Sequence, residues 1–111
     1  MPNKRRTIAL EVTFLHSFHE KSAGLIGKNP IRPISFSTHW GIHTFGMRQP
    51  IDVLILDKKH QVRHLVQRIQ PNHFFFWNPI YSTVVELPAG WITKHTITLG
   101  DTILLHSPSR H

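Results

Sequence analysis

One acid stands where acids are rarely found, inside a run of apolar residues. Asp52 lies within the segment Ile51 to Leu56, which is otherwise entirely apolar. Because burying a lone charge is very costly, this carboxylate must be hydrogen-bonded, paired or placed at a sheet edge. It could act as a general base, with Asp57 or Glu86 as the second acid that paired-carboxylate chemistry needs. The favoured interpretation is structural: Asp52 accepts backbone N–H bonds from the turn beside it, or pairs with Arg48.

Ten histidines among 111 residues make metal binding the second chemistry to weigh. His16 and His19 are three residues apart in an expected helix, a spacing that lets both reach one ion. His39 and His43, taken with Asp52, form the other candidate metal set. The sequence contains no His-Glu-x-x-His motif and no cysteine, and no spacing specifies a complete set of ligands. Surface or hydrogen-bonded histidines are therefore favoured, no catalytic residue is assigned, and no cofactor is identified.

Four consecutive aromatic residues, Phe74 to Trp77, form the third feature of interest. They fall in an expected loop between Gln70 and Pro79, and four neighbouring rings cannot all point inward from one loop. Either they cap an open end of the fold, or some stay exposed and form a contact patch. Both outcomes are left open. Stacking of nucleic-acid bases ranks behind them, because stacking platforms have cations interleaved and here Asn and Pro flank the run.

Composition limits the classes of function. Hydrophobic residues make up 40% and charged residues 17% of the chain, which is typical of a globular protein. The net charge of +7 invites a nucleic-acid partner. However, only Lys4-Arg5-Arg6 is a cationic cluster, so that partner is not favoured. No transmembrane span and no signal peptide are recognised, and a cytoplasmic protein is expected.

Periodicity predicts a mainly β chain. Strands are expected over 8–14, 34–47 with a bulge at Gly41, 51–56, 61–69, 81–87 and 102–106, with short helices over 15–25 and after 88–90. Turns are expected at 48–50, 57–60 and 100–101. This pattern indicates one domain, 1–111, built as a β-sandwich or barrel with one or two short helices. Its expected tails are a basic 1–6 and a frayed 107–111.

Several short motifs occur in an order that resembles a known family. The chain carries Gly24-Leu25-Ile26-Gly27, then Phe45-Gly46-Met47 with Pro50-Ile51-Asp52, then Val84 to Gly90 (VVELPAG), then Gly100-Asp101. This order is similar to the uncharacterised prokaryotic family catalogued as domain of unknown function 192. The resemblance implies a jelly-roll-like sandwich and no established activity, and many relatives are exported. Gly46 replaces the family's tryptophan, and the loop after Met47 is shortened to Arg48-Gln49, so a pocket lined there would be altered.

These observations favour a small non-enzymatic β-domain that binds an unknown small ligand or a protein partner. The expected site is a cleft that brings together His43, Phe45, Met47, Asp52, Phe75 and Trp77. The main alternative is a metal-dependent or acid/base enzyme that uses His43 and Asp52, with His39 as a further metal ligand. A nucleic-acid accessory protein is the third hypothesis, and it rests on charge alone.

Overall fold

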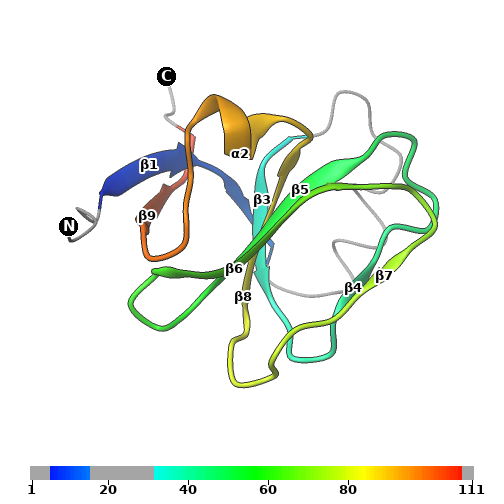
Figure 1. The fold of residues 1–111 in the computed structure, drawn as a ribbon, viewed down its shortest axis with the longest axis horizontal. Helices are drawn as coiled ribbons and strands as arrows, with labels where there is room; N and C mark the ends of the chain where they lie inside the picture. Colours follow the sequence, from blue (N-terminus) through cyan, green and yellow to red (C-terminus); the bar gives the residue numbers. More distant parts are fainter. Residues whose placement is uncertain (1–5, 16–31, 109–111) are drawn as a thin grey trace.

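The computed structural model describes residues 6–15 and 32–108, and within them the chain is mainly β, as expected (Figure 1). The strands are β1 (Thr7–Glu11), β2 (Thr13–Phe14), β3 (Ile34–Ser37), β4 (Ile42–His43), β5 (Ile51–Leu56), β6 (Val62–Ile69), β7 (Phe74–Phe75), β8 (Thr83–Pro88) and β9 (Thr102–His106); the helix α2 spans Trp91–Lys94. The helix expected over 15–25 lies outside the described residues, apart from Leu15. No helix in the described part of the chain is long and apolar enough to cross a membrane.

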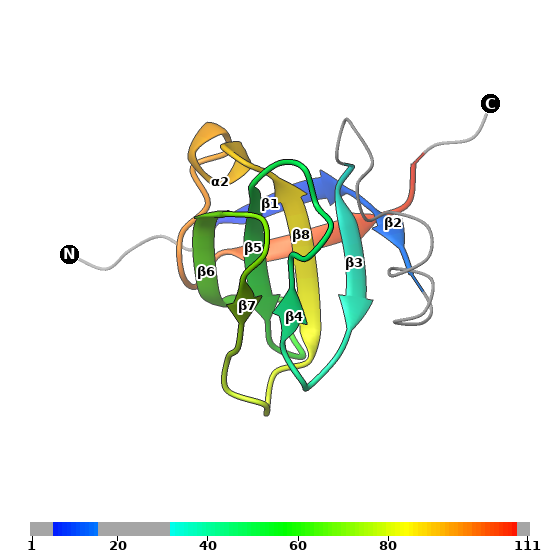
Figure 2. The same ribbon diagram turned by 90° about the vertical axis from the view of Figure 1, so that its right-hand side faces the viewer.

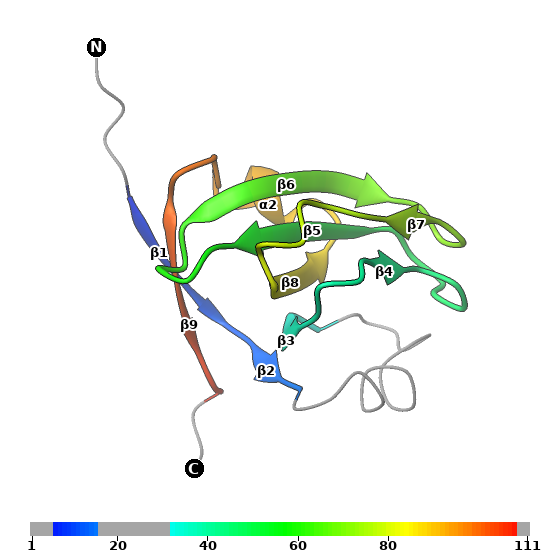
Figure 3. The same cartoon turned by 90° about the horizontal axis from the view of Figure 1, so that it is seen from below.

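A five-stranded sheet, ordered β2-β3-β8-β5-β6, is the centre of a sandwich-like fold. Its first pair, β2 and β3, is parallel, and every other pair is antiparallel. The parallel pair β1–β9 and helix α2 lie on one side of this sheet, and the pair β4–β7 lies on the other (Figures 1 and 2). Seen from below, β1–β9 and β4–β7 stand at opposite ends of the molecule (Figure 3).

Strand β5 is buried on both faces, and this explains its continuous apolar run. One face of the sheet contributes Leu54 and Leu56 to a first core, and the other contributes Val53 and Ile55 to a second. The first core consists of Leu10, Val12, Leu54, Leu56, Val62, Val85, Leu87, Ile92, Ile97 and Ile103. The second consists of Ile34, Phe36, Ile42, Ile51, Val53, Ile55, Ile69 and Val84. Each fully buried Leu or Ile side chain contributes about 1.5–3 kcal/mol, so both cores hold the sheet in place.

Two irregularities in the pairing of β6 with β5 explain why buried and exposed residues do not alternate regularly along β6. Ile51 pairs with Ile69 and Val53 with Val66, so two residues of β6 face the single residue Asp52. Nearer the start of β6 the register shifts again, and Arg63 is the extra residue. Such bulges bend a strand and change the direction of its side chains. Both changes matter for the sites described below.

The prediction of one continuous strand over 34–47 is wrong. Strand β3 ends at Ser37, Trp40 is 86% exposed, and the chain turns at Gly41 with a φ of +89° before β4 begins. A Cβ atom on Gly41 would lie 2.4 Å from a ring carbon of Phe76, so glycine is required by space as well as by φ. The segment 48–50 does bend as expected. It joins β4 to β5, which lie in different sheets and not side by side.

Candidate functional site

The carboxylate of Asp52 is fully buried and accepts three backbone hydrogen bonds. One oxygen, Oδ1, accepts from the N–H of Arg68 at 2.9 Å. The other, Oδ2, accepts from the N–H groups of Gly90 at 3.1 Å and Ile92 at 2.9 Å. The bulge in β6 presents the Arg68 donor, in the left-handed region at φ 57°. Asp52 therefore fastens β6 and the start of α2 to the central strand.

This arrangement confirms a structural acceptor but corrects its partners. The expected donors were the neighbouring turn at 48–50 or the side chain of Arg48, and the observed donors come from β6 and the turn before α2. Helix α2 has no side-chain cap of its own at Gly90, so Asp52 satisfies N–H groups that a helix start leaves without partners. With no exposed surface and three donors in place, the carboxylate is enclosed within the fold.

The two acids considered as catalytic partners of Asp52 lie elsewhere. Asp52 pairs with Leu87 across β5 and β8, so the next residue, Glu86, projects from the opposite face of the sheet. Asp57 follows the far end of β5, five residues along, or about 16 Å at ~3.3 Å per residue. No carboxylate pair is formed at Asp52 by these residues, and the geometry gives no support to paired-carboxylate chemistry there.

The alternative metal set of His39, His43 and Asp52 is not formed. Among the described residues, no group of three or more His, Asp or Glu side chains is placed to hold an ion. His39 contacts the carbonyl of Pro79 at 2.5 Å through Nδ1. His43 instead stacks on Phe45, with ring centroids 5.1 Å apart, and its Nδ1 accepts the Phe45 N–H. His16 and His19 lie outside the described residues.

The aromatic run Phe74 to Trp77 shows both outcomes that the sequence left open. Its first two residues form β7, where successive side chains point to opposite faces. Phe75 and Trp77 pack against the second core, and the Trp77 indole donates to the Tyr81 carbonyl at 2.6 Å. Phe74 and Phe76 are 61% and 65% exposed. The run therefore caps the core with one half and faces solvent with the other.

Three exposed rings and one half-buried ring form a connected aromatic surface, which we define as His43, Phe45, Phe74 and Phe76. Phe74 meets Phe45 edge-on at 4.9 Å between centroids and stacks on Phe76 at 5.9 Å. Of the six predicted cleft residues, only His43 and Phe45 belong to this surface. Met47, Phe75 and Trp77 pack against the second core, and Asp52 projects into the first core on the other face of the sheet. The six residues thus do not line one cleft.

A groove that the sequence did not reveal lies beside the turn between β5 and β6. Its volume is about 800 Å³. Its walls come from the end of β5 and its turn, the start of β6, and the approach to β8, with one residue from the loop after β3. The lining residues are His39, Leu56, Asp57, Lys58, Lys59, Gln61, Arg63, Ile80, Tyr81, Ser82 and Thr83. Lys58-Lys59 gave a local signal, but only the fold shows that Arg63 joins them.

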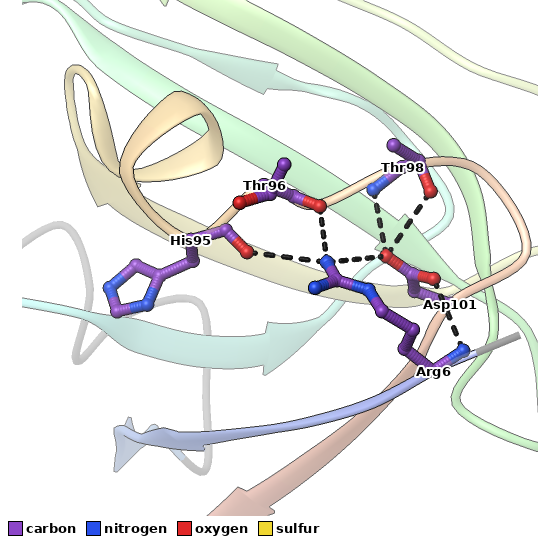
Figure 4. Close-up of polar contacts among 5 residues, drawn as sticks. All are labelled: Arg6, His95, Thr96, Thr98 and Asp101. Atoms are coloured by element: carbon purple, nitrogen blue, oxygen red, sulfur yellow. Dashed lines mark hydrogen bonds and ion pairs between the residues drawn. The ribbon is translucent and has the colours of Figure 1, made fainter.

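A second buried carboxylate, Asp101, ties the start of β1 to the loop before β9 (Figure 4). Its Oδ2 accepts from Thr98 through the N–H at 2.9 Å and the hydroxyl at 3.2 Å, and Arg6 adds an ion pair at 3.4 Å. The Arg6 guanidinium also donates to the carbonyls of His95 and Thr96. Burial raises the pKa of Asp101. The hydrogen bonds from the backbones and side chains of Thr98 and Arg6 have the opposite effect and outweigh it, so the net pKa lies below its usual range.

Comparison with known proteins agrees with this fold. The model of the family described as DUF192, "Uncharacterized ACR", matches residues 1–105. A UPF0127 protein of Pyrococcus furiosus is 27% identical over 104 residues, which cover 88% of this chain and 89% of the relative. These matches confirm the resemblance read from the motifs.

Two solved structures share the architecture. A protein of unknown function from Novosphingobium aromaticivorans superposes with a TM-score of 0.72 at 14% identity, over 82% of this chain and 71% of that one. A protein of Sinorhizobium meliloti described as a candidate transcription regulator gives 0.67 at 17% identity, over 82% and 78%. At such identities the likeness concerns the fold alone.

Proposed function

The chain belongs to the DUF192 family, "Uncharacterized ACR", and from its geometry we propose a non-enzymatic binding domain whose aromatic surface contacts protein. The observation that carries this proposal is the exposure of three rings that are linked by contacts to Phe74. Phe45, Phe74 and Phe76 are 41%, 61% and 65% exposed. Contiguous exposed apolar patches mark interaction sites, and aromatic residues are enriched in protein interfaces.

The chemistry of the surface favours protein over nucleic acid. Base-stacking platforms combine rings with cations that track the phosphates. Within the described residues, the cation–ring pairs lie elsewhere, with Arg63 on Tyr81 and Lys94 on Trp91. The aromatic surface instead contains ring–ring contacts, with His43 as its polar member. Such a surface suits the apolar centre of a protein interface.

The partner we propose is a second copy of the chain. Within the surface, aromatic rings already form stacked and edge-on pairs. A two-fold axis would place the same rings of two copies against each other, where they can form pairs of the same kinds. Each copy carries a net charge of +7, so two copies repel each other. Salt screens that repulsion, with a Debye length of about 8 Å at 0.15 M. Self-association through this surface should therefore strengthen as salt is added.

Sedimentation velocity over a range of protein and salt concentrations tests the proposal. In a symmetric dimer, the double variant Phe74→Ser and Phe76→Ser removes four rings. At about 1 kcal/mol or more for each ring, the dissociation constant should rise by about a thousand-fold. Phe14→Ser is the matched control, because Phe14 is a 40% exposed ring on β2, outside the aromatic surface. Its association should equal that of the wild type.

Two results would overturn the proposal. One is a wild-type chain that stays monomeric up to about 1 mM, where a favourable contact would be worth only ~4 kcal/mol. The other is a double variant that associates as strongly as the wild type. Thermal unfolding separates loss of contact from loss of fold, because Phe75→Ser should lower the melting temperature and the exposed pair should leave it nearly unchanged.

A further inference from the structure

We propose that the groove beside the β5–β6 turn binds a small organic anion, with a phosphate or carboxylate group attached to an apolar body. The groove is lined by other residues than the aromatic surface, so the inference stands apart from the self-association proposed above. A volume of about 800 Å³ lies within the range of ~300–1,000 Å³ that small-molecule sites occupy. The groove is therefore large enough to cover most of such a ligand.

The charges around the groove favour an anion. Lys58, Lys59 and Arg63 contribute three positive charges and Asp57 one negative charge, which leaves +2. The Asp57 carboxylate is already engaged, because its Oδ1 accepts the N–H groups of Lys59 and Gln61, both at 2.9 Å. That engagement holds the turn that carries the two lysines. None of the three cations has an ion pair among the described residues, so their charges are available to a ligand.

Of the three cations, Arg63 is the one whose side chain the fold constrains most. It is the extra residue where the register between β5 and β6 shifts, and bulges of this kind redirect a side chain. Its guanidinium lies over the ring of Tyr81, with 5.6 Å between Cζ and the ring centroid. A guanidinium held on an aromatic face keeps its planar fork ordered, and that fork matches the oxygens of phosphate and carboxylate groups.

The remaining lining residues suit both parts of the proposed ligand, its apolar body and its anionic group. Ile80 provides the apolar surface and is 68% exposed, whereas Leu56 lines the groove from within the first core and is fully buried. Ser82 and Thr83 add hydroxyl groups that can donate to an anion. His39 donates from Nδ1 to the Pro79 carbonyl, which can only accept, so its Nε2 remains for the groove. Charged, hydroxyl and apolar groups thus line one hollow, as in a site for an amphiphilic anion.

Calorimetric titration of the purified chain at low salt tests the inference with three probes: phenyl phosphate, inorganic phosphate and phenol. Phenyl phosphate should bind best, inorganic phosphate more weakly, and phenol not measurably. Arg63→Gln should weaken phenyl phosphate binding by about tenfold, the effect of losing one charge-assisted hydrogen bond. Lys59→Gln should weaken it less, because that side chain is not held by a ring. Lys94→Gln, a cation outside the groove, is the matched control and should bind as the wild type does.

Amide chemical shifts in NMR spectra should locate the probe at 57–63 and 80–83. Equal affinity of wild type and Arg63→Gln would overturn the inference, as would phenol binding as well as phenyl phosphate. A short single-stranded oligonucleotide is the counter-probe. If the oligonucleotide binds through the same amides, with steep loss of affinity in salt, and phenyl phosphate does not bind, the groove is a nucleic-acid contact and the small-ligand assignment is wrong.

Discussion

Replacing Asp52 with asparagine tests the structural role of the buried carboxylate. The side chain keeps its shape, loses its charge, and must turn an NH₂ group toward at least one backbone N–H. In the less costly orientation the amide oxygen faces Gly90 and Ile92, which both donate to Oδ2 of the carboxylate. The NH₂ group then meets the N–H of Arg68, which donates to Oδ1 in the wild type. The Arg68 N–H therefore loses its acceptor, and the two remaining hydrogen bonds go to an uncharged oxygen.

The cost can be estimated from these three contacts. A bond to a charged group is worth about 1.5–3 kcal/mol against ~1 kcal/mol for a neutral one, and a buried donor without an acceptor costs about 1–3 kcal/mol. The neutral amide is also easier to bury than a carboxylate, which offsets part of the loss. We expect Asp52→Asn to lower the free energy of unfolding by about 3 kcal/mol, out of a total of ~5–15 kcal/mol.

Urea unfolding followed by circular dichroism measures this loss. At a slope of roughly 1.5 kcal/mol per M, the midpoint should fall by about 2 M. Asp57→Asn is the matched control, because the two N–H groups on Asp57 share a single oxygen that an amide retains, and its loss should stay below about 1 kcal/mol. An Asp52→Asn midpoint within error of the control would refute the reasoning, because it would mean that the three bonds do not hold the fold together.

Two further predictions concern Asp101 and Gly41. Folding lowers the pKa of Asp101, so the stability that its carboxylate provides is present above the unfolded pKa, near 4, and is lost as the pH falls through the lower folded value. Urea unfolding should show wild type more stable than Asp101→Asn at pH 7, with the gap closing in acid; a gap independent of pH would contradict this. Gly41→Ala should cost more than Gly100→Ala, because both glycines have φ near +90° but only at Gly41 does a Cβ meet Phe76 and the Phe75 carbonyl. Equal melting temperatures for the two variants would show that the clash is relieved at no cost.

Sequence reasoning succeeded where one local pattern decides a structure. The continuous apolar run of β5, the turn at 57–60 and the last strand, Thr102–His106, follow from periodicity and turn residues, and each is present. The short helix expected after 88–90 is also present, as α2. In each case the segment's own residues specify both its conformation and the face that it buries.

It failed where distant segments decide the structure. Strands β4 and β7 have two residues each, too few to show an alternation, and they pair across more than thirty positions of sequence. The donors to Asp52 lie 16, 38 and 40 residues away, so the sequence predicts an acceptor but not its partners. The groove is assembled from separated segments in the same way, and Arg63 enters it through a register shift that no local pattern announces.

The central structural claim is that Asp52 is a buried acceptor enclosed within the fold. Native-state hydrogen exchange of the wild-type chain tests it most directly, because it reads the amides of Arg68, Gly90 and Ile92 without altering any side chain. We predict that these amides are protected as strongly as those of β5, and exchange only when the whole fold opens. Exchange of these three amides at the rate of exposed loop residues would contradict the claim, because it would show that the carboxylate is open to water.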